Sequence, residues 1–379
     1  MAFFMILNKN GLSDFAGQRV YKDVLTTTRG DRSAMSQALG LSGYRSKIIG
    51  IGGYVPERVV TNDDLSKIMD TSDEWIVQRS GIRERHWVSP GQTNTDLSAA
   101  ASQEALKNAG LLASDVDMIV FATLNPDYFV PGNGVLLQER LGAHGIPAID
   151  IRQQCSGFVY AMAIADQFIR TGGYQRVLVV GSEIQSRGID KTTKGRDVSV
   201  LFADGAGAVV MTRTTVADQA NDSFLYSSHL HSDGRGAKNL WIPAPGPALD
   251  DNERMTHGMI DEGLHYPRMD GRKVFVDAVS HMCTVLIEGL TANELTVNDI
   301  DIFFFHQANL RINNSVADHL KIPTEKVFNT IERFGNTTAA TIPLGMSEAW
   351  KQGKLKPGMR VGIASFGSGY AWGSTILRL

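Results

Sequence analysis

The 379-residue sequence predicts an α/β fold in which two similar halves each supply one unit of sheet and helices. Glycines cluster at the ends of short apolar runs, which is typical of tight strand–helix turns. The string DVDMIVFATL resembles DIDIFFFHQA, and QRVLVVGS resembles MRVGIASFGS. Asp117 and Asp301 lie 184 residues apart (301 − 117), and so do Arg176 and Arg360 (360 − 176). Two pairs at one offset indicate an internal duplication, although any two buried strands look somewhat alike.

Composition excludes several classes of protein. The net charge is −3 and both signs are spread along the chain, so we expect neither nucleic acid nor a membrane as partner. Two cysteines are too few for a disulfide framework, which favours a reducing cytoplasm. No apolar run approaches the roughly 18 residues that span a bilayer, and the apolar start MAFFMIL lacks the flanks of a signal peptide. We expect no metal site and no bound cofactor.

Residues 1–44 are predicted to form an N-terminal extension, because they show no clear period and carry the polar stretch TTTRGDRS. One short helix is expected near Ser33–Leu41, and Met35 is a candidate alternative start. The first half of the fold is expected at residues 45–213, and the second half at residues 214–379.

From Lys47 onward, strands and helices alternate. Met118–Thr123 and Arg176–Gly181 are apolar runs typical of strands buried on both faces of a sheet that helices cover. Thr95–Ala109 carries apolar residues at helical spacing. Further strands are expected at Lys47–Ile51, Ala148–Ile151 and Ile302–Phe305, and short helices at Asn62–Met69 and Ser72–Arg79.

Cys155 lies in IDIRQQCSGF, between an apolar strand and an Ala-rich helical pattern. The positive end of a helix stabilises a thiolate, so this position predicts a lowered thiol pKa. Free backbone N–H groups at the same place can hold an oxyanion. The competing interpretation is a small, buried, apolar side chain. Cys283 lies inside the helical pattern HMCTVLIEGL and is expected to serve packing.

His306 and Asn336 are the two other candidates for chemistry. His306 follows three Phe residues, at the carboxyl end of a predicted buried strand, where catalytic groups collect in α/β folds. Asn336 lies in RFGNTTAATIP, a Gly–Asn turn that leads into a helix. Taken singly, a core histidine and a helix-capping asparagine are the competing interpretations.

The order Cys, His, Asn fits two chemistries. One is the papain-like cysteine protease, and the other is the decarboxylating condensing enzyme. QQCSGF lacks the cysteine signature of the protease, and an internal duplication has no place in that fold. The Gly-rich tail SFGSGYAWGS lets the backbone approach a ligand closely, but it lacks the lysine of a phosphate-binding loop.

From Lys47 to Leu379 the chain resembles the β-ketoacyl-[acyl-carrier-protein] synthase III family, the initiating condensing enzymes of bacterial fatty-acid synthesis. The strings that carry the resemblance occur in order along the chain: TSDEWIVQRSGIRER, QQCSGF, FADGAGAVV, HQANLRI, RFGNTTAATIP and FGSGYAWGS. The resemblance implies a thiolase-like five-layer αβαβα sandwich built from two duplicated halves, usually as a homodimer. It also implies an acyltransferase of the cytoplasm.

The resemblance implies a role for each site residue. Cys155 would take the acyl group from acyl-CoA, and its N–H would form an oxyanion hole with that of Ser368. His306 and Asn336 would hold the malonyl thioester carbonyl while CO2 leaves and an enolate forms. The coenzyme A contacts implied by the resemblance are Trp75, Arg79, Arg196, Asn309 and Arg311.

Two departures from the family pattern concern partners and substrate. Gln307 and Arg311 are the expected docking residues for a carrier protein, but no basic residue follows Arg311 before Lys321. The malonyl carrier is therefore left open between acyl carrier protein and coenzyme A. Val130, in the loop LNPDYFVPGN, stands where some relatives carry an aromatic residue, so the acyl pocket is expected to be deeper. Alternatives are a secondary-metabolite enzyme that uses longer or aromatic acyl-CoA and, more remotely, a non-catalytic scaffold.

Overall fold

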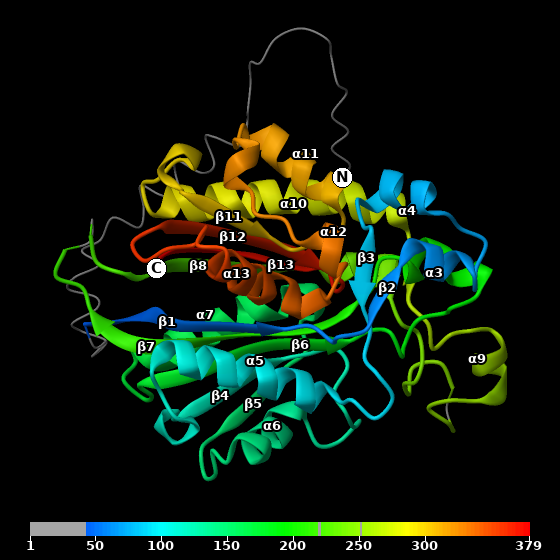
Figure 1. Cartoon of the computed structure of the whole chain (residues 1–379), viewed down its shortest axis with the longest axis horizontal. Helices are drawn as coiled ribbons and strands as arrows, with labels where there is room; N and C mark the ends of the chain where they lie inside the picture. Colours follow the sequence, from blue (N-terminus) through cyan, green and yellow to red (C-terminus); the bar gives the residue numbers. More distant parts are fainter. Residues whose placement is uncertain (1–42, 219–220, 251) are drawn as a thin grey trace, which may run out of the picture. The chain divides into compact units, whose positions relative to one another are not determined.

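The computed structural model describes residues 43–379, apart from 219–220 and 251. The helix predicted at Ser33–Leu41, and all of the predicted extension except residues 43 and 44, lie outside the described residues. Elements are identified here by the labels of Figure 1.

Five layers of helix and sheet alternate through the described part (Figure 1). The layers contain, in order, an outer helix pair, a first sheet, a central helix pair, a second sheet and a second outer helix pair. The helix pairs are α5 (Asn94–Ala109) with α6 (Asn133–Leu141), α7 (Gly157–Arg170) with α13 (Thr341–Lys351), and α10 (Gly271–Ala292) with α11 (Leu310–Leu320). The predicted αβαβα order is confirmed.

Each sheet mixes parallel and antiparallel pairs. The first sheet contains, in spatial order, β1 (Tyr44–Tyr54), β7 (Asp204–Thr215), β6 (Arg176–Ile184), β4 (Met118–Ala122) and β5 (Ala148–Ile151). The second contains β11 (Ile302–Phe305), β12 (Arg360–Gly367), β13 (Ala371–Arg378) and β8 (Phe224–Ser232). The pairs β4–β5, β4–β6 and β11–β12 are parallel, and the other pairs are antiparallel. Every residue of β4 and β11 is buried, as expected for strands that helices cover on both faces.

Local sequence sets the ends of the helices and the smaller elements. Ser72 caps α4 (Asp73–Ser80), while Thr93 and Asp96 form a capping box at α5. The smaller elements are β2 (Val59–Thr61), α3 (Asn62–Ser66), β3 (Glu84–His86), α8 (Arg196–Ser199), β9 (Leu240–Trp241), α9 (His257–Asp261), β10 (Arg268–Met269) and α12 (Ile331–Phe334). Short 3₁₀ turns lie at η1 (Ala113–Asp115), η2 (Gln154–Ser156), η3 (Thr193–Gly195), η4 (Gly234–Asn239), η5 (Val297–Asp299), η6 (Thr324–Lys326) and η7 (Thr338–Ala340).

Helix α10 is the single helix in the described ranges that is long and apolar enough to cross a membrane. Its apolar face instead packs against β12 and β13 in the core of the second half. Cys283 lies on this helix and is partly buried in that core, which agrees with its predicted packing role.

The duplication is visible residue by residue. Five elements of the first half recur 184 residues later (302 − 118 for β4 and β11): η1 as η5, β4 as β11, η2 as η7, α7 as α13, and β6 as β12. Asp117 accepts hydrogen bonds from the N–H groups of Gln175 and Arg176, and Asp301 accepts one from the N–H of Arg360. In each half, the aspartate that precedes β4 or β11 therefore holds the start of the neighbouring parallel strand, which is β6 or β12.

Two equivalent turns lie at the centre of the molecule. The first turn, η2, leads into α7, and the second turn, η7, leads into α13. Each begins with a non-glycine residue of positive φ, which is 43° at Gln154 and 46° at Thr338. The position after it holds Cys155 in the first turn and Ala339 in the second. One backbone shape therefore carries a thiol in one half and a methyl group in the other.

Candidate active site

The first turn places Cys155 against a strand of the second half. A Cβ added to Gly367, the last residue of β12, would lie 2.6 Å from the Cβ of Cys155, so glycine is required for this approach. The backbone N–H groups of Ser368 and of Cys155 itself lie beside the cysteine sulfur and lower the pKa of the thiol. The hydroxyl of Ser368 donates to the carbonyl oxygen of Leu240, which holds the loop in place. Two N–H groups therefore converge where an oxyanion would form.

Burial dominates the electrostatics of this thiol. Cys155 is 7% exposed, and removal from water raises its pKa to about 12, with a further increase from the charge of Glu183. The two N–H groups lower the pKa but do not balance these effects. The lowered pKa predicted from the helix terminus is therefore wrong for the unacylated enzyme. Burial also raises the pKa of Cys283, to about 11, so the surroundings rather than thiol acidity distinguish the two cysteines.

His306 directly follows β11 and is 2% exposed. Burial lowers the pKa of its imidazole to about 3, so the ring is neutral at physiological pH and carries one N–H. Its Nδ1 lies 2.8 Å from Oγ1 of Thr341, and the same oxygen lies 3.0 Å from the carbonyl oxygen of Thr338. When the Thr341 hydroxyl donates to Nδ1, the N–H of the ring is at Nε2.

Asn336 is held by backbone contacts between the two halves. Its N–H donates to the carbonyl oxygen of Leu201 at 2.8 Å, and its carbonyl oxygen accepts from Ala203 at 2.9 Å. The side-chain Oδ1 accepts from the N–H of Thr338 at 2.9 Å. The amide nitrogen is therefore the end of this side chain that is left to donate to a ligand.

Cys155, His306 and Asn336 line one cavity of about 90 Å³. The three predicted catalytic residues therefore come together. Most of the remaining lining is apolar, including Val274, Phe275, Ala278, Met282, Ile312 and Phe366. An apolar, water-poor setting strengthens hydrogen bonds to a developing negative charge.

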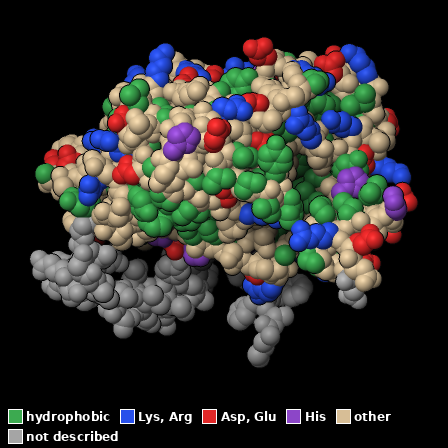
Figure 2. Space-filling model, turned by 90° about the horizontal axis from the view of Figure 1, so that it is seen from below, with side chains coloured by type: hydrophobic (Ala, Val, Ile, Leu, Met, Phe, Trp, Pro, Cys, Tyr) green, Lys and Arg blue, Asp and Glu red, His purple; other side chains and the backbone are tan. Residues whose placement is uncertain are grey.

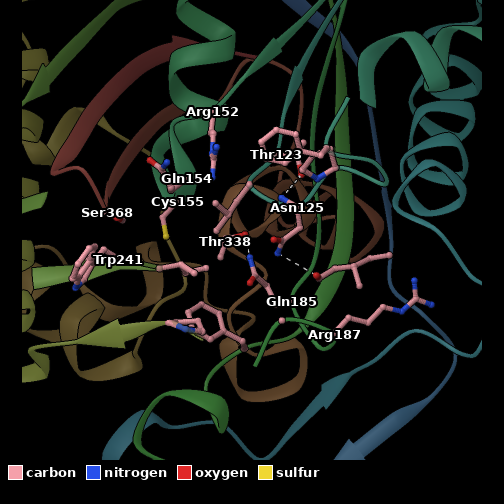
Figure 3. A pocket seen from close by; sticks show the side chains of 18 of the residues that line it. Thr123, Asn125, Arg152, Gln154, Cys155, Gln185, Arg187, Trp241, Thr338 and Ser368 are labelled. Carbon is pink, nitrogen blue, oxygen red and sulfur yellow. Dashed lines mark hydrogen bonds between the residues drawn. The ribbon is translucent and has the colours of Figure 1, made fainter. Parts of the chain in front are cut away.

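A larger chamber of about 810 Å³ also reaches Cys155 (Figure 3). Figure 3 shows the cysteine sulfur pointing into the space that Trp241, Gln185 and Thr338 surround. Cys155 is therefore the meeting point of a small cavity with the histidine and asparagine, and a chamber large enough for an acyl group.

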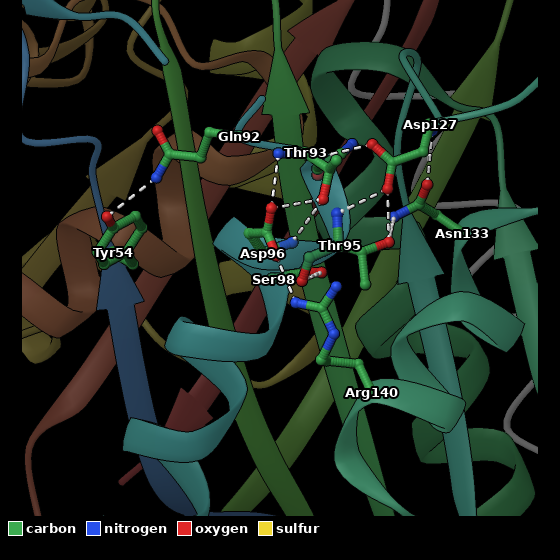
Figure 4. A network of polar contacts seen from close by, with 10 residues as sticks. Tyr54, Gln92, Thr93, Thr95, Asp96, Ser98, Asp127, Asn133 and Arg140 are labelled. Atoms are coloured by element: carbon green, nitrogen blue, oxygen red, sulfur yellow. Dashed lines mark hydrogen bonds and ion pairs between the residues drawn. The ribbon is translucent and has the colours of Figure 1, made fainter. Parts of the chain in front are cut away.

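The loop at residues 124–132 borders this chamber and is fixed at its base. The carboxylate of Asp127 accepts from the N–H groups of Asn94 and Thr95, at the start of α5, and the N–H of Asp127 donates to Asn133 (Figure 4). Beyond this base, Tyr128, Phe129 and Val130 are exposed.

Figure 2 shows hydrophobic side chains gathered on the face of the molecule seen from below Figure 1, the side on which α6 and β5 lie. Tyr128 and Phe129 line the chamber, whereas Val130, which is 78% exposed, does not line it in its own chain.

The predicted coenzyme A contacts are brought together by α4, α8 and α11. The guanidinium carbon of Arg79 lies 4.2 Å from the ring centre of Trp75, and that of Arg196 lies 5.1 Å from it. Asn309 caps α11, donates to the carbonyl oxygen of Arg79 at 2.9 Å, and lines the same cavity as His306. An aromatic ring beside two guanidinium groups suits a ligand with a flat ring and phosphates.

The two residues predicted to dock a carrier protein, Gln307 and Arg311, lie in different environments. Arg311 is exposed, with its guanidinium carbon 5.6 Å from the ring centre of Phe275. Gln307 is 2% exposed, donates to the carbonyl oxygen of Phe305, and accepts from the N–H groups of Thr330 and Ile331. Its amide braces the chain behind His306, so the prediction that Gln307 docks a carrier protein is wrong.

Sequence reasoning missed Glu183, Thr338 and Thr341, which surround the predicted residues. Both threonines lie in the string RFGNTTAATIP beside Asn336, where only the asparagine was singled out. Glu183 is the second-to-last residue of the apolar strand β6 and is fully buried, and burial raises its pKa to about 7. An acidic residue inside RVLVVGSEI was the available signal. Within the described ranges, no group of His, Cys, Asp and Glu could hold a metal ion.

Comparison with known proteins gives concordant matches. Residues 149–234 match the model of 3-oxoacyl-[acyl-carrier-protein (ACP)] synthase III, and residues 290–379 match the model of its C-terminal part. The chain is 45% identical over 333 residues to the β-ketoacyl-[acyl-carrier-protein] synthase III of Xanthomonas campestris pv. campestris, covering 88% of this chain and 98% of that protein.

Solved structures show the same fold. The 3-oxoacyl-[acyl-carrier-protein] synthase III of Aquifex aeolicus is 40% identical, with a TM-score of 0.79 over 88% of this chain and 100% of that one. The priming β-ketosynthase of the R1128 polyketide pathway is 30% identical, with a TM-score of 0.80 over 88% of this chain and 96% of that one.

Proposed function

This chain belongs to the β-ketoacyl-[acyl-carrier-protein] synthase III family, and we propose that Cys155, His306 and Asn336 perform its chemistry. It is an acyltransferase that catalyses the condensation that initiates fatty-acid synthesis. The observation that carries the residue assignment is the single cavity lined by all three side chains, with two backbone N–H groups beside the cysteine sulfur.

In the first half-reaction, the sulfur of Cys155 attacks the thioester carbonyl of acyl-CoA. The N–H groups of Cys155 and Ser368 stabilise the oxyanion of the tetrahedral intermediate. Coenzyme A then leaves, and the thiol proton of the cysteine ends on the sulfur of coenzyme A, so the exchange is balanced. The acyl chain extends into the chamber of about 810 Å³. Once acylated, the cysteine bears no charge, so its high pKa no longer matters.

In the second half-reaction, the malonyl thioester enters the smaller cavity. The Nε2–H of His306 and the amide nitrogen of Asn336 donate to its carbonyl oxygen. Loss of CO2 leaves an enolate, and these two donors stabilise its negative charge in a site that excludes water. The enolate carbon attacks the acyl carbonyl, the bond to the sulfur of Cys155 breaks, and a β-ketoacyl product forms. A neutral imidazole suits this role, because its ring stays a hydrogen-bond donor without titrating near pH 7.

Several finer points of the proposal concern substrates and assembly. We place coenzyme A at Trp75, Arg79, Arg196 and Asn309, and we place the carrier of the malonyl group, acyl carrier protein or coenzyme A itself, near Arg311. The exposed residues Tyr128, Phe129 and Val130, on a loop with a fixed base, support a homodimer in which this loop closes the partner's chamber. We propose a cytoplasmic enzyme whose two halves divide near residue 213, two residues before β7 ends.

Mass spectrometry of the intact protein, incubated with a panel of acyl-CoAs, tests the nucleophile. The expected adduct has the mass of the acyl group, disappears in Cys155→Ala, and persists in Cys283→Ala, whose thiol lies on α10 away from both cavities. Equal acylation of the two variants would contradict the assignment.

A further inference from the structure

The second turn keeps a strained backbone although it carries no nucleophile. Thr338 has a φ of 46°, a left-handed conformation that β-branched residues rarely adopt. The residue that follows it, Ala339, offers no chemistry. Strain of this kind persists where the surrounding structure holds it, and it is concentrated at functional sites. The contacts of Thr338 show what the conformation achieves.

The backbone of Thr338 lies beside the side chains of Asn336 and Thr341. Its N–H donates to Oδ1 of Asn336 at 2.9 Å, which turns the amide nitrogen toward the cavity. Its carbonyl oxygen lies 3.0 Å from Oγ1 of Thr341, which itself lies 2.8 Å from Nδ1 of His306. The Thr341 hydroxyl has one hydrogen, which goes to Nδ1 of His306 when Nε2–H is the donor, so the backbone of Thr338 fixes Asn336 and does not hold Thr341 at the same time.

The side chain of Thr338 is held from the first half of the molecule. Nε2 of Gln185 donates to its hydroxyl oxygen at 3.1 Å, and the hydroxyl lies close enough to the buried carboxylate of Glu183 to lower the pKa of that carboxylate. Glu183 also accepts from the N–H groups of Leu124 at 2.9 Å and Asn125 at 3.2 Å. The carboxylate that holds Thr338 thereby also holds the start of the loop that borders the acyl chamber.

The duplication gives an independent reason to regard this contact as functional. Glu183 in β6 and Gly367 in β12 are equivalent positions, 184 residues apart (367 − 183). At Gly367 the strand end brings the N–H of Ser368 to Cys155 in the first turn. At Glu183 the equivalent strand end brings a carboxylate to Thr338 in the second turn. Each strand therefore serves the turn of the other half.

We propose that Thr338 is a positioning residue that orients the amide of Asn336, and that Glu183 and Gln185 hold its hydroxyl in place. The inference rests on the proposed function of the malonyl site and adds the residue that aligns it. Thr338 is not itself a catalytic residue, because its backbone contact reaches the malonyl group only through Asn336.

The test compares three threonine variants in two separate assays. Thr338→Val keeps the shape and β-branching but lacks the hydroxyl, Thr338→Ser restores the hydroxyl, and Thr337→Val is the matched control. The hydroxyl of the neighbouring Thr337 is buried and has no partner in the described part of the chain. Acylation of Cys155 by acyl-CoA is followed by mass spectrometry, and CO2 release from malonyl-CoA is followed as the second half-reaction.

Thr338→Val is expected to lower CO2 release roughly tenfold to a hundredfold, mainly in kcat rather than KM, and by a larger factor than it lowers acylation, which is measured in the same preparations because Thr338 also lines the acyl chamber. Thr338→Ser should recover most of this loss, and Thr337→Val should stay within about twofold. Glu183→Leu, which has no acceptor, should lower CO2 release similarly, and adding it to Thr338→Val should cost little more, because both changes break one contact.

Normal CO2 release by Thr338→Val, or equal losses in Thr338→Ser and Thr338→Val, would overturn the inference. If Thr338→Val does not fold, the comparison of Thr338→Ser with Glu183→Leu decides: a loss confined to Glu183→Leu supports the contact, and normal release in both overturns it. Failure of the proposed function is a separate result, because it would show as wild-type CO2 release that persists in His306→Ala and Asn336→Ala.

Discussion

The two turns at the centre of the molecule share a backbone and differ in their chemistry. Both begin with a residue of positive φ near 45° and lead into a central helix. The first turn carries Cys155, and the second carries Ala339 with the hydrogen-bond partners of His306 and Asn336 beside it. Duplication thus produced two copies of one turn. One copy now holds the acyl group, and the other activates the malonyl group.

The difference also shows in what packs against each turn. The last residue of β12 is Gly367, which lets the backbone approach the thiol, while β6 approaches the second turn with Gly181 and Glu183. A Cβ on Gly181 would lie 2.4 Å from the carbonyl oxygen of Ala339. Neither half can therefore form a complete site alone, because each turn depends on a strand from the other half.

The largest expected effect comes from breaking the packing at the first turn. In Gly367→Ala the added methyl carbon would lie 2.6 Å from the Cβ of Cys155 and 3.1 Å from its backbone nitrogen. The strand end must move away, and the N–H of Ser368 moves with it. We expect acylation to slow by a factor of about 10² to 10³, as for other oxyanion-hole donors. Acylation assays should show near-normal rates for Gly234→Ala, where nothing lies within 4 Å of the new carbon. A Gly367→Ala enzyme that acylates normally would contradict this account of the oxyanion hole.

The next effect concerns the unequal spaces on the two sides of Cys155. The acyl chamber is about 810 Å³ and the malonyl cavity about 90 Å³, so we expect medium-chain or bulky acyl-CoAs to acylate Cys155 better than acetyl-CoA. Each buried methylene contributes about 0.8 kcal/mol, so three or four add roughly 2–3 kcal/mol, or about a hundredfold in kcat/KM.

Specificity constants for acetyl-, butyryl-, octanoyl- and an aromatic acyl-CoA provide the measurement. Val130→Phe should shift the preference toward acetyl-CoA if the loop closes the partner's chamber. The control is Val59→Phe, at an exposed position of β2. Tyr128 or Phe129 could close the same space instead. A preference for acetyl-CoA that Val130→Phe leaves unchanged would show that Val130 does not set chain length.

A smaller expected effect concerns how stability depends on pH. The second turn has the carboxylate of Glu183 beside it, whereas the equivalent position beside the first turn is Gly367. Burial raises the pKa of Glu183 to about 7 from an ordinary value of 4.5. Between these two pH values the folded state keeps a proton that the unfolded state has lost, so the free energy of unfolding falls as pH rises toward 7.

Urea unfolding of the wild type and Glu183→Gln, at pH 5 and pH 8, measures this contribution. We expect the wild type to lose on the order of 1–3 kcal/mol more than the variant between the two conditions, because glutamine does not titrate. Parallel losses in the two proteins would show that Glu183 does not take up a proton on folding.

Strands and helices could be predicted from the sequence where a single physical signal, such as a short apolar run, dominates. β5 and β11 span the predicted residues Ala148–Ile151 and Ile302–Phe305, because short apolar runs between turns leave little choice. The 184-residue offset indicated the duplication, and three strings indicated Cys155, His306 and Asn336. The raised pKa of Cys155 could not be predicted, because it depends on how much protein covers the thiol. Gln307 was misassigned because a polar residue beside a site looks the same in sequence whether it faces solvent or braces the core.

Contacts between the halves were the part least accessible to sequence reasoning. Glu183 and Thr338 are separated by more than 150 positions, and neither belongs to a recognisable catalytic pattern alone. Their meeting depends on how the two sheets pack around the central helices. The positive φ of Thr338 likewise has no signature in a threonine-rich string, since most residues of this type adopt ordinary backbone angles.

The central claim is that the two turns divide the reaction, and separate measurement of the two half-reactions in His306→Ala and Asn336→Ala tests it most directly. Acyl-Cys155 is followed by intact-protein mass spectrometry, and CO2 release from malonyl-CoA is followed in the same preparations. The account predicts that both variants still form acyl-Cys155 and that both lose CO2 release and condensation, by a factor of about 10² or more. Loss of acylation in both variants would contradict it, and would mean that His306 activates the thiol in the manner of a hydrolase.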